Sequence, residues 1–341
     1  MMDIGIIRSI SIRCSEMREK ILEKPVKDLE LDSVLTVKDL VLQFNNIGGF
    51  MASKVYQSVE IIEKMLKDSE CTIFLSFTAN LIATGLRSIF AEIIKKRFVD
   101  AIITTGGSID HDIARSFGGA YYVGDFNYDD IFLKELNIHR LGSVLIPFEN
   151  YGEIIEKEVH QVLKELVLEK NEWSPSELLK EFGKRINDPN SLLRAAYKAG
   201  IPIFSPGLLD SAFGTAIYTF NQKQRFKNKE KIHLNFLRDM EKISEIVFSS
   251  EKLGGVIIGG GISKHHVIWW AQFRGGLDYV VYITTAVEWD GSLSGARPRE
   301  AVSWGKVKPA ALQTTIYGDA TIVLPLIYLC IKDVKRGKSN A

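Results

Sequence analysis

The sequence predicts an α/β fold: a doubly wound, mostly parallel, Rossmann-like sheet preceded by an N-terminal helical extension. Short apolar runs rich in β-branched residues alternate with longer amphipathic segments, an alternation typical of βαβ units. No Gly-, Pro- or Ser-rich linker divides the 341 residues. We therefore expect an extension over residues 1–55 and a single α/β catalytic domain over residues 56–341.

The predicted elements follow in chain order. Strands are expected at 71–76, 100–104, 120–123, 143–146, 201–204, 255–258 and 279–283, where the apolar runs are short. Helices are expected at 80–96, 153–169 and 231–249, with a closing helix at 319–335. Ser174, Pro175 and Glu177 indicate the start of another helix, because serine and glutamate can form a capping box and proline fits the first turn.

Composition narrows the class of protein. The chain has 46% hydrophobic and 25% charged residues, as globular proteins do, and its net charge of +1 disfavours nonspecific nucleic-acid binding. Its longest apolar runs, near Val256 and Ile322, are far shorter than the roughly 20 residues of a membrane span. Cys14, Cys71 and Cys330 lack metal-ligand spacing and fit free thiols in a reducing compartment. We expect a cytoplasmic protein without a nucleic-acid or membrane partner.

Small and polar residues follow five of the predicted strands. These sequences are SFTANLIATG (76–85), TTGGSIDHD (104–112), SPGLLDSAFGT (205–215), GGGISKHH (259–266) and the pair Thr284-Thr285. Ligands of open parallel sheets bind at the carboxyl ends of strands, and glycines let the backbone approach a phosphate. Several such ends predict a dinucleotide site, although a single glycine pair would indicate only a turn. No G-x-G-x-x-G follows the first strand, which disfavours an ordinary Rossmann dehydrogenase.

The segment SGARPREAVSWGKV (294–307) places a carboxylate, an indole and a lysine close together. Pro298 and Gly305 predict the start and end of a helix of about two turns, on which Glu300 and Trp304 share one face. Lys306 follows the predicted stop. Carboxylates and aromatic faces attract cations, and a lysine can act as a nucleophile, so the segment suits chemistry on a polyamine. A surface helix with a buried tryptophan and a solvated lysine is the alternative.

The adjacent residues His265 and His266 do not predict a metal site. Neighbouring residues on a helix point apart, and no cysteine or carboxylate stands at ligand spacing nearby. Contact of one histidine with a substrate amine and burial as a satisfied core histidine both remain open.

Taken together, these motifs resemble the deoxyhypusine synthase family. The most specific one is DGSLSGARPREAVSWGK (290–306), and GGGISKHH, TTGGSIDHD, FSPGLLDSAFG and YGDAT occur in the order that the family has. The resemblance covers residues 24 to 332. It implies a doubly wound sheet that binds NAD, and a homotetramer with active sites at dimer interfaces. It also implies NAD-dependent transfer of the aminobutyl group of spermidine, through a lysine imine, to one lysine of the initiation factor 5A precursor, in hypusine biosynthesis.

The resemblance also assigns residues. It implies that Lys306 is the nucleophile and that His265 accepts a proton from the amine. The substrate-binding residues it implies are Glu300, Trp304, Gly291, Ser292 and Trp269. The cofactor-binding residues it implies are Asn80, Thr105, Gly106, Gly107, Asp210, Gly259, Gly260, Gly261, Thr285, Asp290, Asp319 and Ala320. A ribose-binding carboxylate such as Asp210 or Asp319 favours NAD over NADP.

Four positions depart from the pattern of eukaryotic members. Leu293 and Thr215 replace aspartates that anchor amines, Trp269 replaces an asparagine, and His111 replaces an acidic residue. Either other groups compensate, with Trp269 a candidate through cation–π contact, or the amine substrate differs. Two alternative functions follow: transfer of the aminobutyl group to a free diamine, as in homospermidine synthesis, and a catalytically silent NAD-binding paralogue.

Overall fold

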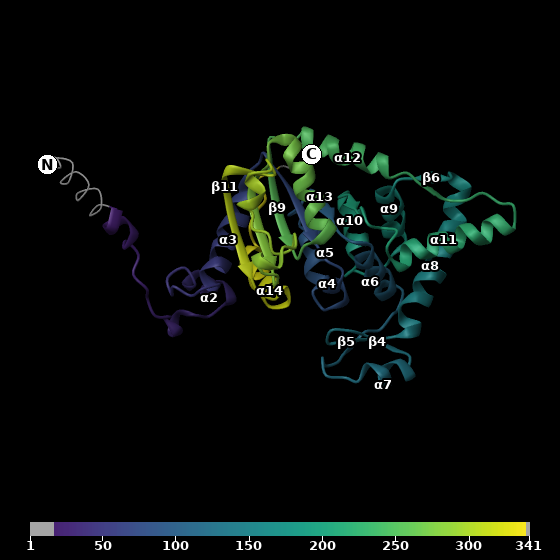
Figure 1. Ribbon diagram of the computed structural model, residues 1–341, viewed down its shortest axis with the longest axis horizontal. Coiled ribbons are helices and arrows are strands. Elements are labelled where there is room, and N and C mark those ends of the chain that lie inside the picture. The colour runs from purple at the N-terminus through teal and green to yellow at the C-terminus, as the bar shows by residue number, and fades with distance from the viewer. Residues whose placement is uncertain (1–16, 339–341) are drawn as a thin grey trace.

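The computed structural model describes residues 17–338 and has a parallel six-stranded sheet at its centre (Figure 1). The strand order is β11-β10-β9-β1-β2-β7, and every pairing within it is parallel. The strands are β1 (Cys71–Phe77), β2 (Ala101–Ile103), β7 (Ile203–Phe204), β9 (Lys252–Ile258), β10 (Leu277–Thr284) and β11 (Val307–Tyr317). The predicted doubly wound sheet is confirmed.

Helices cover both faces of this sheet. The helices from residue 37 onward are α2 (Val37–Gln43), α3 (Ala52–Lys67), α4 (Asn80–Ala83), α5 (Arg87–Lys95), α6 (Gly106–Ser116), α7 (Asp130–Glu135), α8 (Gly152–Glu169), α9 (Pro175–Arg185), α10 (Leu192–Ala199), α11 (Ala212–Phe226), α12 (Phe236–Phe248), α13 (Gly261–Ala271) and α14 (Ala320–Ile331), and of these α7 lies beside a smaller sheet. Figure 1 shows α8 to α11 grouped on the side of the sheet away from β11. The predicted division at residue 55 falls within the first turn of α3 and remains a prediction.

Alternate residues of each central strand enter two separate cores. Ile73 and Leu75 of β1 pack with α3, α5 and α14, whereas Phe74 packs with α12 and α13 on the opposite face. In β10, Val281 and Ile283 face the first core, and Val280 and Tyr282 face the second. Side chains of a strand alternate between faces, so a strand buried on both sides reads as a continuous apolar run. This is why the predicted strands were recognisable.

Winding of the chain reverses between β1 and β9. From β1 the sheet grows through β2 to β7 on one side, and from β9 through β10 to β11 on the other. The connections on the two sides of this point leave on opposite faces, which opens a crevice outside the carboxyl ends of β1 and β9. The fold therefore predicts a ligand site between residues 78–80 and residues 259–261.

The structure differs from the prediction at three elements. The helix predicted at 80–96 is two helices, because the chain breaks at Thr84 and offers the carbonyls of Ile82 and Thr84 to Arg115. The helix predicted at 231–249 begins only at Phe236, after its Asn235 cap and the short strand β8 (His233–Leu234). The third is β11, which was not predicted. It is a half-exposed edge strand that contains Pro309, and edge strands tolerate proline and lack a continuous apolar run.

Two small sheets lie outside the central one. The strands β3 (Tyr122–Val123), β5 (Val144–Pro147) and β4 (Ile138–Leu141) form an antiparallel sheet, which Figure 1 shows below the main body beside α7. The pair β6 (Glu172–Trp173) and β8 is parallel. The predicted helix start at Ser174 is confirmed as a capping box with Glu177, and the closing helix is α14.

The remaining general predictions concern cysteines and membranes. Cys71 and Cys330 are buried free thiols, whereas Cys14 lies outside the described residues, as does the first part of the predicted N-terminal extension. No helix in the described part of the chain combines the length and apolar character required to span a bilayer.

A buried ion pair holds α6, which begins at the crevice, in place. Arg87 donates from Nε to Asp112 at 2.6 Å, and both side chains are almost fully buried. Asp112 also accepts hydrogen bonds from the Ser191 hydroxyl and from the backbone N–H of Leu193, at the start of α10. One carboxylate therefore ties α6 to α5 and α10, and its loss would leave a buried guanidinium partly unpaired.

We expect Asp112→Ala to lower the free energy of unfolding by about 3–5 kcal/mol, because Arg87 stays buried without its main partner. Urea denaturation measures the change. The matched control is Asp130→Ala, which removes the exposed partner of Arg140 and is expected to change stability little. Equal effects of the two substitutions would show that the buried pair does not hold α6.

Candidate active site

The residues predicted to bind a cofactor all follow the carboxyl ends of central strands. Asn80 follows β1, Thr105 to Gly107 follow β2, Asp210 follows β7, Gly259 to Gly261 follow β9, Thr285 and Asp290 follow β10, and Asp319 and Ala320 follow β11. Carboxyl ends of parallel strands lie at one edge of a sheet. The structure thus brings residues from six separate motifs to a single edge, although their roles remain a proposal.

Besides the four-residue helix α4, two helices that begin at this edge have an N-terminus without a side-chain cap. α6 begins at Gly106 and α13 begins at Gly261, whereas α9, α10, α11 and α14 are each capped by a serine or aspartate side chain. The strands that precede α6 and α13 flank β1 on either side. Uncapped N–H groups and the helix dipole attract anions, so the two N-termini suit the phosphates of a dinucleotide.

Buried hydroxyls without a partner lie at the same edge. Thr105 Oγ1 and Ser205 Oγ are buried and form no hydrogen bond with the described residues. Thr105 stands at the N-cap position of α6, and Ser205 directly follows β7. Buried polar groups are normally paired. A polar ligand at this edge would supply the missing partners, so the residues present fit a dinucleotide.

Glycines in the motif GGGISKHH are required by close contacts. A Cβ on Gly260 would lie 2.0 Å from Ser294 Oγ, and Gly259 has a φ of +84°. Across the crevice, a Cβ on Gly106 would lie 2.5 Å from Ser211 Cβ. The glycines therefore let a second chain segment approach each of the two uncapped helix N-termini, Ser294 at α13 and Ser211 at α6.

The three carboxylates predicted at the cofactor site differ in availability. Asp290 accepts a hydrogen bond from the backbone N–H of Ser292 at 2.6 Å, and Asp319 caps α14 through Thr321. Asp210 is exposed, and its side chain makes no hydrogen bond or ion pair with the described residues. Asp210 is thus the carboxylate best placed for ribose hydroxyls.

Residues 285–306, which we call the crossover, connect β10 to β11 without an α-helix. Since the two strands are parallel, the crossover returns from the carboxyl end of β10 to the amino end of β11. Ala301 belongs to the core beneath α12 and α13, and Leu293 and Val302 pack against it. α13 runs in the same direction, from the carboxyl end of β9 toward the start of β10. The crossover and α13 therefore lie on one face of the sheet.

Lys306 lies where the crossover meets α13. Its Nζ is 5.8 Å from the ring centre of Trp269 and 5.2 Å from that of Trp304. The Trp269 ring stacks on His265, with ring centres 5.6 Å apart at 25°. Burial and the nearby Lys306 charge both lower the pKa of His265. The structure thus brings the predicted nucleophile, the predicted proton acceptor and two indoles into one group.

Two expectations for the crossover were wrong in detail. Instead of two α-helical turns, residues 298–305 contain a short 3₁₀ turn, η5 (Glu300–Val302), followed by a turn in which Gly305 has a φ of +67°. Trp304 lies beyond η5, so the predicted helix face shared by Glu300 and Trp304 does not form. Trp304 is 68% exposed, so the alternative of a buried tryptophan is also wrong. Gly291, Ser292 and Glu300 are exposed residues of the same crossover.

The positions that depart from the family pattern carry no negative charge. Leu293 packs against the core, and the Thr215 hydroxyl donates to the Ser211 carbonyl at 2.9 Å. His111 Nδ1 lies 2.9 Å from the Tyr121 hydroxyl, and burial lowers the pKa of His111 to about 4. These residues therefore offer a polyamine no ionic anchor.

Sequence reasoning missed Lys264, a fully buried lysine, although the apolar residues at i+3, i+4 and i+7 from it, Val267, Ile268 and Ala271, indicated a buried helix face. Within residues 17–338, no group of three or more His, Cys, Asp or Glu is arranged to hold a metal ion.

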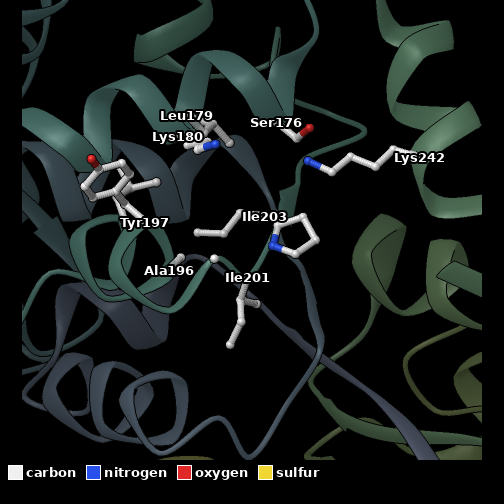
Figure 2. Close-up of a pocket in the computed structure, with 11 residues that line it drawn as sticks. Ser176, Leu179, Lys180, Ala196, Tyr197, Ile201, Ile203 and Lys242 are labelled. Atoms are coloured by element: carbon white, nitrogen blue, oxygen red, sulfur yellow. The ribbon is translucent and has the colours of Figure 1, made fainter. Parts of the chain in front are cut away.

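A separate cavity of about 80 Å³ lies beside α9, α10 and the start of β7, as Figure 2 shows. Its lining includes Ser176, Lys180, Tyr197 and Lys242. None of the predicted site residues contributes to it, and it adjoins the amino end of β7 rather than the carboxyl edge.

Comparisons with known proteins agree on one family. The family model for deoxyhypusine synthase matches residues 39–331. A Sulfolobus acidocaldarius protein named "Probable deoxyhypusine synthase" is 52% identical over 310 residues, which cover 91% of this chain and 97% of that protein. A Thermoplasma volcanium protein of the same name is 50% identical, covering 91% and 98%. The crystal structure of a "putative deoxyhypusine synthase" from Entamoeba histolytica aligns with a TM-score of 0.64 and 25% identity, covering 92% of this chain and all of that one.

Gly260→Ala tests the contact between α13 and the crossover. We expect it to lower the free energy of unfolding by about 1–3 kcal/mol, because the new Cβ would overlap Ser294. Dinucleotide binding, measured by calorimetry, is expected to weaken as well. Gly207→Ala is the matched control, since its Cβ would meet Ile262 at an ordinary 3.6 Å. A Gly260→Ala protein as stable as the control would contradict the close contact.

Proposed function

We propose, from the premise that the chain belongs to the deoxyhypusine synthase family and is a transferase, that it transfers the aminobutyl group of spermidine to a lysine of the initiation factor 5A precursor. The observation that carries this proposal is the position of Lys306 between the Trp269 and Trp304 rings and close to His265. An amine nucleophile, a proton acceptor and faces that bind cations are what aminobutyl transfer from a polyamine requires.

The cofactor that we propose is NAD, held at the carboxyl edge of the sheet. The uncapped N-termini of α6 and α13 would hold its phosphates, and Asp210 would hold ribose hydroxyls. Bound NAD would supply the oxidation of the carbon next to the secondary amine of spermidine, and the NADH so formed would supply the hydride that reduces the imine left on the acceptor lysine. The buried hydroxyls of Thr105 and Ser205 would gain their missing hydrogen-bond partners from the same ligand.

Lys306 then carries the aminobutyl group. In our proposal its neutral amine attacks the oxidised carbon of the polyamine, diaminopropane leaves, and an imine joins Lys306 to the aminobutyl group. The amine of the acceptor lysine attacks the same carbon and releases Lys306 unchanged. His265 takes the proton that the secondary amine loses, which its lowered pKa allows because the imidazole is neutral at neutral pH.

The indoles bind the cationic substrate in this proposal. Trp269 and Trp304 each present a ring face near Lys306 and are partly exposed. A cation–π contact contributes roughly 0.5–2 kcal/mol. Glu300, on the same crossover, would pair with a terminal amine of the polyamine. We further propose a cytoplasmic homotetramer in which a second copy covers the exposed rings and closes the active site.

A second candidate function is supported by the uncharged positions. Leu293, Thr215 and His111 offer no carboxylate, so the site would suit an amine or an acceptor other than those of eukaryotic members. Transfer to a free diamine, as in homospermidine synthesis, needs the same Lys306 and no protein acceptor. A catalytically silent NAD-binding paralogue is the remaining alternative, and Lys306, His265 and the two indoles argue against it.

Trapping of the imine tests the proposed function directly. After incubation with NAD and spermidine, borohydride is expected to leave a reduced aminobutyl adduct on Lys306, located by mass spectrometry. Label that then moves to the factor precursor supports the first function, and label that moves only to putrescine supports the second. If none of the tested polyamines forms an adduct, only the catalytically silent NAD-binding paralogue remains.

Lys306→Arg is expected to keep the fold and NAD binding but to lose turnover, because a guanidinium stays protonated and cannot attack. Steady-state assays and calorimetry measure the two properties. Lys308→Arg, two residues further on and ion-paired with Asp278, is the matched control. Wild-type turnover by Lys306→Arg would require another nucleophile.

The pH dependence reports on His265. The pKa of His265 lies below the ordinary histidine value of about 6.5, so its neutral form is present at neutral pH and is lost only in more acidic solution. We expect kcat/KM to show an acidic limb, in which the rate falls as His265 becomes protonated. His265→Gln should lower the rate and remove this acidic limb, whereas His233→Gln, on the remote strand β8, should retain it. An unchanged limb in His265→Gln would assign it to another group.

A further inference from the structure

Lys264 is a fully buried lysine that the proposed chemistry does not use. Its exposed fraction is 1%, and it makes no ion pair with any described residue. Lysine is almost never fully buried unless it is paired. Burial lowers the pKa of Lys264 to about 8, and the nearby Glu300 carboxylate partly opposes this shift. A side chain held so unfavourably needs a structural or functional reason.

The contacts of Lys264 join α13 to the crossover. Its Nζ donates a hydrogen bond to the Ala296 carbonyl at 2.7 Å and lies 4.0 Å from the ring centre of Tyr282 on β10. The hydroxyl of Tyr282 is buried without a partner, so this residue meets the ammonium with its ring face alone. The lysine thus links a helix, a strand and the crossover at one point.

Close contacts of two glycines also hold the crossover in place near Ala296. A Cβ on Gly295 would lie 1.9 Å from the Val287 carbonyl oxygen, and a Cβ on Gly260 would lie 2.0 Å from Ser294 Oγ. Residues 294–296 are therefore held between the first turn of α13 and an earlier part of the crossover. Beyond Ala296, the chain continues to Glu300, Trp304 and Lys306, which are exposed or half-buried.

We propose that Lys264 is a positioning residue, whose hydrogen bond to Ala296 fixes the crossover against α13. Lys264 directly precedes His265 on α13, and Ala296 lies ten residues before Lys306 on the crossover. The anchor therefore sets the placement of Lys306 and Trp304 relative to His265 and Trp269. This inference rests on the proposed function, because the geometry that it maintains is that of aminobutyl transfer.

Lys264→Met tests the role, since methionine is similar in length and cannot donate a hydrogen bond. We expect kcat to fall about tenfold or more, because small displacements of reacting groups are costly, with little change in the Kd of NAD. Amide hydrogen exchange in a peptide over residues 292–305 should speed up about fivefold or more, while β9 and β10 keep their protection. Wild-type kcat and wild-type exchange would overturn the proposal.

Two further variants sharpen the test. Lys170→Met is the matched control, because Lys170 also lies over an aromatic ring, that of Trp173 at 4.2 Å, but is remote from the crossover. It should leave kcat and exchange over 292–305 unchanged. Lys264→Gln retains an N–H donor with a shorter reach, and we expect kcat and protection between those of Lys264→Met and wild type. If Lys264→Met does not fold, Lys264→Gln provides the test. A lowered kcat together with wild-type hydrogen-exchange protection over residues 292–305 would overturn the positioning role.

Failure of this inference is distinguishable from failure of the proposed function. Hydrogen exchange reports the anchoring of the crossover without any reaction. If the wild-type protein forms the Lys306 adduct and Lys264→Met behaves as wild type in rate and exchange, the inference fails and the function stands. If the wild-type protein forms no adduct, the function fails, and with it the catalytic part of the inference.

Discussion

The parallel pairing of β10 with β11 is the constraint on which the site depends. Parallel neighbours require the chain to return to the starting edge of the sheet, and such returns are usually helical. Here residues 285–306 return as an irregular crossover that packs against the core beneath α12 and α13. The crossover leaves the carboxyl edge beside the proposed cofactor site and reaches Lys306 at the amino end of β11. One connection thus carries both the proposed cofactor residue Asp290 and the proposed nucleophile Lys306.

α13 packs against this crossover, through the contacts of Gly260 with Ser294 and of Lys264 with Ala296. Three glycines, Gly259 to Gly261, lead into α13 at the carboxyl edge, and the helix then presents His265 and Trp269, one turn apart, as it crosses the same face. Its inward side carries Lys264, which bonds the crossover, and Val267 and Ile268, which join the core. A single helix can therefore bind an anion at its N-terminus and present aromatic groups to Lys306 further along. This arrangement needs the close contact of Gly260 with Ser294.

The sequence predicted the central sheet well because strands buried on both faces read as continuous apolar runs. It did not predict β11, since an edge strand with Pro309 and alternating exposure lacks such a run. This omission limited the prediction of the site. The motif 294–307 indicated that Glu300, Trp304 and Lys306 act together, but His265 and Trp269 meet Lys306 only because β11 pairs in parallel with β10. The sequence did not predict the 3₁₀ turn at Glu300 either, because the same residues also suit an α-helix.

Recognition by aromatic faces has a consequence for the range of amines that the proposed site could accept. A carboxylate fixes an ammonium through directed hydrogen bonds, whereas a ring face attracts a cation over a broad area. Leu293, Thr215 and His111 remove directed anchors, and Trp269 and Trp304 supply ring faces. Polyamines that differ in the spacing of their nitrogens would then lose less binding energy than they would between fixed carboxylates. Selectivity would move from the binding of amines to the step in which a carbon must lie within reach of Lys306.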